Sequence, residues 1–520
     1  METLLKNHTE PIHQSTDKYW IFFTWILIVL FFIWGLFQLV AGEKIQVKGG
    51  FGWDGVMYAD AVPGIPEILF SREYTPSHAA RLLPPTLVAG IMSLTGAEMD
   101  AENIIFYFGL LNYLMIFFSI LIWIQICKKL QAGVRLRFLL LALFLLSFPY
   151  LKMINYYTCL TDFTAVFIGF LTAWSFFTQR TWKLFLAFIL ASFTWQIAAL
   201  TIPFLAIFRQ TEIEVKPLAF RDWRTWILAL GITGMVGLIS LFIIWKEPMA
   251  GQEIYLTLLA SKVLLVLVTI IGSVCLIGSL FLIWSRVFAF DWLDFVPGLF
   301  KSIRWGWLGL FLITSIIIRF YQHGFTGQST NITFIWFIEC IYQAAILVPL
   351  SNLVCLVIFF GPVFFLIYYH WNSISRLIIQ SGPGMILFFT GNLLIMVDPE
   401  GRHSSFIFPM LLTFCLISMK KGGFEPGAGL TVLFTGAALL FSKAWYVINT
   451  PEYLAKIESG IDVSSAAFQS YFWNIGYFMS YPSYMIQLPA IVVFGFILIF
   501  FYHKFGRDPA IRSFKNPSQF

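Results

Sequence analysis

The stretch YWIFFTWILIVLFFIWGLFQLV, residues 19–40, contains no charged side chain and decides the fold class. An α-helix of about 20 apolar residues spans the hydrocarbon core of a bilayer. No small-residue cleavage site follows this stretch, so we expect it to stay in the protein as a membrane helix rather than to be removed as a signal peptide. The chain is therefore predicted to be a membrane protein from its first helix onward.

The rest of the chain has the same character. Of 520 residues, 59% are hydrophobic and only 12% are charged, whereas a soluble domain is about 25% charged. We expect an all-α fold, a polytopic transmembrane helical bundle of about 12–14 membrane segments that forms one domain over residues 1–520. The expected spans lie at about 19–41, 103–127, 138–150, 163–179, 184–208, 225–245, 263–284, 305–319, 348–369, 383–397, 403–419, 427–447 and 486–502.

The basic residues indicate the orientation of the bundle. Most of the 33 Lys and Arg residues lie in short loops on one side of the apolar runs, and cytoplasmic loops are enriched in these residues. We therefore place both termini in the cytoplasm and the chain in the inner (cell) membrane. The large extracytoplasmic loops are then 41–102 and 446–487. A net charge of +6, dispersed between apolar segments, does not suggest a nucleic acid partner.

This orientation requires that residues 184–208 return to the side from which they start. The segment carries Ser192, Thr194, Trp195 and Gln196 at its middle and Pro203 in its second half. Two half-helices of about 12 residues would each reach only about 18 Å into the membrane. We therefore predict a re-entrant hairpin with its tip near Trp195. An ordinary span with a polar kink is the alternative.

The first outer loop holds the main candidate site, in GGFGWDGVMYADAVPGIPEILFSREYTPSHAAR, residues 49–81. Asp54 and Asp60 are the candidate catalytic carboxylates, because a carboxylate can remove a proton from a hydroxyl or bind a divalent cation together with phosphate. Simple capping of a helix or solvation is the alternative for both. Candidate substrate-binding residues in this loop are Trp53, Tyr58, His78 and Arg81.

Behind Arg81, the run LLPPTLVAGIMSL is too short to span, and its proline pair can begin a helix. We expect it to be an interfacial helix. Arg81 at its start can bind an anionic headgroup, or can simply reach the phosphates of the surrounding lipid.

Other candidate substrate-binding residues lie at the outer ends of later segments: Asp162, Gln196, Asp398, Arg402 and His403. The last three belong to DPEGRH, a short charged turn between two short apolar runs, which should sit recessed. Six cysteines occur singly without metal-binding spacing, and no P-loop, nucleophile elbow or dinucleotide fingerprint is present.

The runs WDGVMYADA and RLLPP resemble the first outer loop of the GT-C superfamily of integral-membrane glycosyltransferases, especially its bacterial members. TCLTDFTAVFIGFLTAW resembles the start of a helix in these proteins, and DPEGRHSSFIFP resembles a charged element late in their chains. The split segment 184–208 matches their half-helix pair. The chain departs from the pattern in having Ala80 before Arg81, where a second Arg is common, and in the separation of Asp54 from Asp60.

The resemblance implies a sugar transferase that uses a polyprenyl-phosphate-linked donor outside the cytoplasm, with an acidic residue of the first loop as base and membrane lipids as its surroundings. It allows Mg²⁺ or Mn²⁺ as a cofactor, with Asp54 and Asp60 as the ligands. Two other classes stay open: a transporter or flippase of lipid-linked sugars, and a non-catalytic assembly subunit. A transporter would predict inverted repeats and mid-membrane charge, which are not visible in the sequence.

Overall fold

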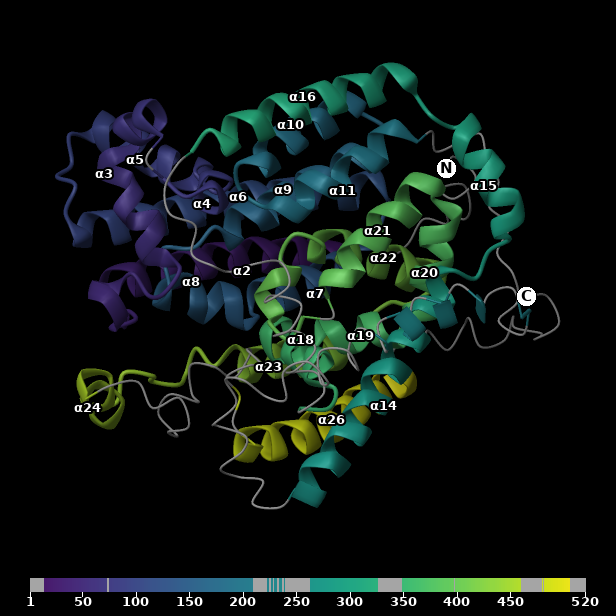
Figure 1. Cartoon of the computed structure of the whole chain (residues 1–520). Coiled ribbons are helices and arrows are strands. Elements are labelled where there is room, and N and C mark those ends of the chain that lie inside the picture. The colour runs from purple at the N-terminus through teal and green to yellow at the C-terminus, as the bar shows by residue number, and fades with distance from the viewer. Residues whose placement is uncertain are drawn as a thin grey trace.

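The structure is a computed structural model that describes residues 14–208 except 73, 262–325, 348–459 except 397, and 481–505, with isolated positions at 222–238 and 479. Within these residues every regular element is helical (Figure 1), and an isolated antiparallel bridge joins Phe208 to Ile303. The expected all-α bundle is therefore confirmed. Most of the expected span at 225–245, and residues 460–478 of the expected outer loop 446–487, lie outside the described residues.

The long apolar helices lie side by side, while α3, α4 and α5 gather at one end of the bundle (Figure 1). The bundle contains α2 (Gln14–Ala41), α6 (Ala101–Lys129), α7 (Val134–Leu145), the π-helical turn η2 (Pro149–Met153), α8 (Ile154–Tyr156), α9 (Asp162–Phe177), α10 (Thr181–Ser192), α11 (Gln196–Ile207), α14 (Lys262–Val287), α16 (Trp305–His323), α18 (Ser351–Phe360), α19 (Val363–Tyr369), α21 (Pro383–Ile395), α22 (Phe408–Lys421), α23 (Ala428–Ser442) and α26 (Tyr481–Phe505). Shorter elements outside it are η1 (Val47–Gly50), α15 (Trp292–Lys301), α20 (Trp371–Gln380), η3 (Gly401–Ser404) and α24 (Pro451–Ser459).

Several of these helices meet the requirements for crossing a bilayer. Five are long and apolar enough by themselves, and the pair formed by α7 and the turn after it, bent by 53°, would make a sixth. Shorter apolar helices, including α9 and α23, lie between them. The chain is therefore a membrane protein with a multi-helix bundle.

The segment expected to fold back on itself does so. The N–H of Arg304 donates to the carbonyl of Ile207 at 2.8 Å, and its Nη1 donates to Oγ1 of Thr181 at 3.0 Å. Thr181 begins α10 and Ile207 ends α11, so the two helices form a hairpin. Arg304 binds the two helix ends at the open side of this hairpin. Each helix has 12 residues, and the tip includes Trp195. The side of the membrane on which this tip lies stays a prediction.

The first loop contains α3 (Gly55–Ser71), α4 (Pro76–Ala79) and α5 (Leu83–Thr95), and α5 is the helix that was expected behind Arg81. The hydroxyl of Thr75 caps α4 by accepting the N–H of His78. Two prolines lie in the first turn of α5, where their missing N–H groups leave no bond unmade. The N–H of Leu83 donates to the carbonyl of Phe193 at 2.9 Å, so this loop packs on the tip of the hairpin.

A buried ion pair joins the beginning of the first loop to the beginning of the last one. Nζ of Lys152, in η2, donates to the carboxylate of Glu43 and, at 2.6 Å, to the carbonyl of Tyr446. The same carboxylate accepts the backbone N–H groups of Ile448 and Asn449 at 3.0 Å and 2.8 Å. A single side chain of the first loop therefore fixes the backbone of a segment about 400 residues later.

Glu43→Gln should destabilise the folded protein by about 3–5 kcal/mol, because removal of one partner leaves the Lys152 ammonium buried without its counter-charge. The side chains of Lys152 and Glu43 are only 9% and 18% exposed, so water cannot replace the lost carboxylate. Thermal unfolding in detergent measures the effect, with Glu98→Gln at an exposed position as the matched control. Equal unfolding temperatures for the two variants would contradict a stabilising role for this pair.

Candidate active site

Three distant parts of the chain meet at Asp54. Nη2 of Arg402, in η3, donates to Oδ2 of Asp54 at 2.7 Å, across 348 positions of sequence. Asp54 occupies the N-cap position of α3, but its side chain makes no capping bond. The carboxylate points to Arg402 instead, and 40% of its side-chain surface is exposed. Helix capping therefore does not account for this residue.

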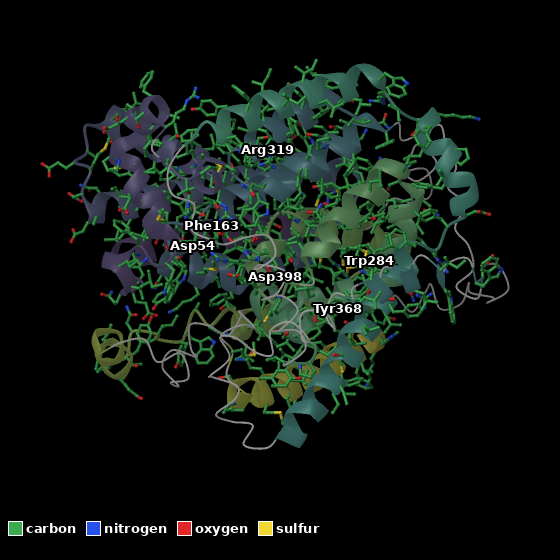
Figure 2. All side chains as sticks on the ribbon, in the orientation of Figure 1. Asp54, Phe163, Trp284, Arg319, Tyr368 and Asp398 are labelled. Carbon is green, nitrogen blue, oxygen red and sulfur yellow. The ribbon has the colours of Figure 1, made fainter. Side chains whose placement is uncertain are left out.

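The turn that carries Arg402 holds it through a chain of charged groups. Nε of Arg402 donates to one oxygen of Glu400, and the other oxygen of Glu400 lies 3.7 Å from Nε2 of His403. Nδ1 of His403 bonds to the carboxylate of Asp398, a side chain with no exposed surface. Asp398 and Asp54, which Figure 2 labels, thus stand at the two ends of one run of ionic contacts. The turn is recessed, as its sequence predicted.

Arg81 approaches the same place from the start of α5. Its Nη1 donates to the hydroxyl of Tyr58 at 2.6 Å, and its guanidinium lies 5.7 Å from the centre of the Trp195 ring. The Trp195 ring is 6.3 Å from the ring of His403. Within the described residues Arg402 pairs with two carboxylates, whereas no ion pair of Arg81 with a carboxylate occurs. The two arginines therefore differ in how available they are to an anion.

These charges set the protonation of the site. Burial raises the pKa of Asp54, but the charges of Arg402 and Arg81 outweigh it and lower that pKa from 3.8 to about 2. Burial lowers the pKa of His403, but the carboxylates of Asp398 and Glu400 outweigh it and raise that pKa above 6.5. At neutral pH Asp54 is thus an ionised carboxylate, and the two neighbouring carboxylates make His403 easier to protonate than a free imidazole.

Asp162 lies behind this group of charges, at the first position of α9. Its side chain is 3% exposed, and its Oδ1 has no hydrogen-bond partner in the described part of the chain. It interacts electrostatically with Arg402, His403, Glu400 and Arg81, so it belongs to the same site. A buried carboxylate oxygen without a donor is rare and commonly indicates an ordered water or a ligand.

Of the remaining sequence candidates, Asp60 and Gln196 lie away from this site and His78 lies within it. Asp60 is exposed on α3, on a face about 120° away from that of Asp54. Burial raises the pKa of Tyr74 and the charge of Asp60 adds to that rise, but this charge is not among those that influence the two arginines. Gln196 is exposed at the start of α11. His78 packs beside the ring of Tyr58, with ring centres 6.3 Å apart. The structure therefore brings Tyr58, His78, Arg81, Asp162 and the 398–403 turn together around Asp54, and leaves Asp60 and Gln196 outside.

Three site residues were not among the sequence candidates. Trp195 lies between Arg81 and His403, and Glu400 connects Arg402 with His403. Tyr157 accepts hydrogen bonds from the backbone of the WDG run, and its ring lies 6.4 Å from that of Trp53. Glu400 stands inside the charged turn and could have been included on that ground. For the two aromatic residues the sequence offers no signal beyond their place near an outer helix end.

The described residues do not fit the metal site that the resemblance allows. No group of three His, Cys, Asp or Glu side chains with metal-binding geometry occurs among them. The two expected ligands diverge, because Asp54 faces Arg402 and Asp60 faces outward. The chemistry below is therefore derived from protein groups alone.

Comparison with known proteins adds no assignment: no family model, no curated protein and no solved structure matches this chain. The functional class proposed below therefore rests on the geometry of the site.

Proposed function

We propose that this chain is a GT-C-like membrane glycosyltransferase that moves a sugar from a polyprenyl-phosphate-linked donor to a lipid, glycan or protein acceptor. The observation that carries the proposal is the carboxylate of Asp54, which is partly exposed, does not cap its helix, and lies beside two arginines at one end of an apolar bundle. In this proposal the protein lies in the inner (cell) membrane with about 12–14 membrane segments and with both termini in the cytoplasm. The site lies on the opposite, extracytoplasmic face.

The reaction needs few groups. The hydroxyl oxygen of the acceptor attacks the anomeric carbon of the donor, and the bond from that carbon to the phosphate oxygen breaks. Polyprenyl phosphate leaves with the electron pair, and the hydroxyl proton passes to Asp54. Attack from the face opposite the departing phosphate inverts the anomeric centre. The protein must therefore provide a proton acceptor on one side of the sugar and a cation on the other.

A carboxylate with a pKa of about 2 is a weak base in the free protein. Two effects favour proton transfer during the reaction. The acceptor hydroxyl becomes strongly acidic as its oxygen bonds to the anomeric carbon, so the proton moves late. A phosphate bound near the arginines also adds negative charge beside Asp54, and a neighbouring like charge raises the pKa of a carboxyl group.

Arg81 is the better candidate for the donor phosphate. Arg402 already shares its charge between Asp54 and Glu400, and its two ion pairs hold it in place. Arg81 has a hydroxyl and an aromatic face as its partners, so its charge is less compensated. We assign Arg81 to the leaving phosphate and Arg402 to the positioning of Asp54. Trp53, His78, Asp162 and His403 line the surroundings of the sugar in this arrangement.

Transfer from defined donors tests the proposal. The purified chain in phospholipid vesicles is supplied with undecaprenyl phosphate carrying a hexose, a pentose or an N-acetylhexosamine, together with a lipid extract as acceptor. Mass spectrometry should show release of undecaprenyl phosphate from one of these donors, dependent on the protein. Passage of an intact donor across the bilayer without release would identify a transporter and overturn the assignment.

Arg402→Gln should introduce an acid limb into the pH profile of kcat/KM. The charge of Arg402 is the largest influence that lowers the pKa of Asp54, so its loss leaves burial to raise that pKa. Because kcat/KM reports the free protein, its value should fall with decreasing pH in the variant where the wild type is still constant. Measurement of kcat/KM from about pH 4 to 8 tests this, because that range includes the ordinary pKa values of carboxyl and imidazole groups.

Arg402→Lys is the control for that experiment, since it keeps the charge and should keep the wild-type profile on the acid side. Identical profiles for wild type and Arg402→Gln would show that the ion pair does not govern the protonation of the catalytic carboxylate.

A further inference from the structure

We propose that Tyr157 is the positioning residue that holds the backbone of the first outer loop so that the Asp54 side chain meets Arg402. The catalytic meaning of this inference rests on the proposed function, but the placement itself does not. Tyr157 lies at the C-terminal end of α8, and 3% of its surface is exposed.

The hydroxyl of Tyr157 binds the backbone at the start of α3. It accepts the N–H of Asp54 at 2.7 Å and the N–H of Gly55 at 3.2 Å. The first N–H groups of a helix have no partner within the helix, and an N-cap side chain usually accepts them. The two groups that Tyr157 accepts are the N–H of the N-cap residue and of the first helical residue, whereas an N-cap side chain reaches the second or third. The phenol therefore holds the turn itself, while the Asp54 carboxylate, which makes no capping bond, reaches Arg402.

Two glycines let the loop close around the phenol ring. At Gly52, where φ is +75°, an added Cβ would lie 2.4 Å from a ring carbon of Tyr157. At Gly55 an added Cβ would lie 2.8 Å from the carbonyl of Cys159 and 3.0 Å from the same ring. Larger residues at either position would push the loop away from the ring. The pattern G-W-D-G thus fits one aromatic side chain from a distant segment.

The segment that carries the Tyr157 ring is itself held by hydrogen bonds within the bundle. The N–H of Tyr157 donates to the carbonyl of Met153, the last residue of η2, at 2.8 Å. The next residue is fixed to α6, because Nδ2 of Asn112 donates to the carbonyl of Thr158 at 2.8 Å. Residue 54 is therefore attached through a buried phenol to the rigid part of the bundle, 103 positions away in sequence.

A cysteine at position 54 reports this placement without any assay of activity. A nearby cation lowers the pKa of a thiol, so Asp54→Cys beside Arg402 should react with a water-soluble alkylating reagent as a low-pKa thiolate. Adding Tyr157→Phe keeps the ring but removes the acceptor of both N–H groups. The thiol pKa, read from the pH dependence of alkylation, should then rise by about one unit or more as the side chain leaves the cation.

Tyr156→Phe is the matched control, since the hydroxyl of Tyr156 bonds to Asn449 and not to the first loop turn. It should leave the thiol pKa of Asp54→Cys unchanged, and labelling of the protein without Asp54→Cys is subtracted throughout. An unchanged thiol pKa in the Tyr157→Phe background would overturn the inference. If that background does not accumulate, Gly55→Ala, which displaces the same turn from the ring, should give the same rise, and its failure to do so would also overturn it.

Turnover separates this inference from the proposed function. If the chain transfers sugar, Tyr157→Phe alone should lower kcat by about 10²-fold, as expected for a small misplacement of a catalytic group, with little change in KM. If the thiol pKa rises in Tyr157→Phe but the protein transfers no sugar, the positioning role of Tyr157 is supported and the proposed glycosyltransferase activity is rejected.

Discussion

Asp54→Asn should lower sugar transfer by about 10²–10⁴-fold while the protein accumulates in the membrane like the wild type. Asparagine keeps the shape of the side chain and can still accept a bond from Arg402, but it cannot take a proton from the acceptor hydroxyl. Since the Asp54 side chain makes no capping bond, the helix loses nothing from the change. Initial rates of undecaprenyl phosphate release, at matched protein levels in vesicles, measure the effect.

Asp60→Asn is the control within the same helix, because Asp60 is exposed and faces away from the arginines. It should retain wild-type rates. Full activity of Asp54→Asn combined with loss in Asp60→Asn would move the base to Asp60. Full activity in both variants would remove the carboxylates of the first loop from the mechanism and would place the base elsewhere in the chain.

Arg81→Gln should lower kcat by about 10²–10³-fold, which is the usual cost of removing one group that stabilises developing negative charge. Glutamine retains a donor that can reach Tyr58, so the local packing survives while the positive charge is lost. Arg81→Lys should recover part of the rate, because lysine restores the charge but not the two-point contact with phosphate. Steady-state kinetics, with the donor from which the wild type releases undecaprenyl phosphate, would separate kcat from KM.

Lys48→Gln removes a positive charge from an exposed position of the same loop and is the matched control. A fall in rate equal to that of Arg81→Gln would show that the loop acts through its general charge and not through a defined phosphate contact. Binding of undecaprenyl phosphate alone should weaken in Arg81→Gln and stay unchanged in Lys48→Gln.

The fold was predictable where the signal was local. Spans of apolar residues and the polar interruption near Trp195 predicted both the bundle and the hairpin, because a helix that is too short and too polar to cross must turn back. Pro203 contributed less than expected, since it lies inside α11 rather than at the break. The break itself lies at residues 193–195, between the two helices.

The site was predictable in part. A charged side chain beside apolar helices is costly unless it is paired or functional, so Asp54, Arg81 and Arg402 could be selected from composition alone. Their partners could not, because a contact between residues hundreds of positions apart depends on how helices pack. Helical periodicity separates Asp60 from Asp54 once α3 is known to begin at Gly55. Asp54 is of a residue type that commonly caps a helix, and only the structure shows that its side chain makes no capping bond.

The ion pair between Asp54 and Arg402 has a consequence for biogenesis. The two residues are 348 positions apart, so at about 5–20 residues per second a ribosome completes Arg402 roughly 20–70 s after Asp54. During that interval the first loop is already in place with its acid unpaired, and the nascent chain holds no finished site. A chain released before η3 would therefore insert most of its helices, lack Arg402 and still be inert. Supplying the missing C-terminal part as a separate polypeptide would be the way to restore it.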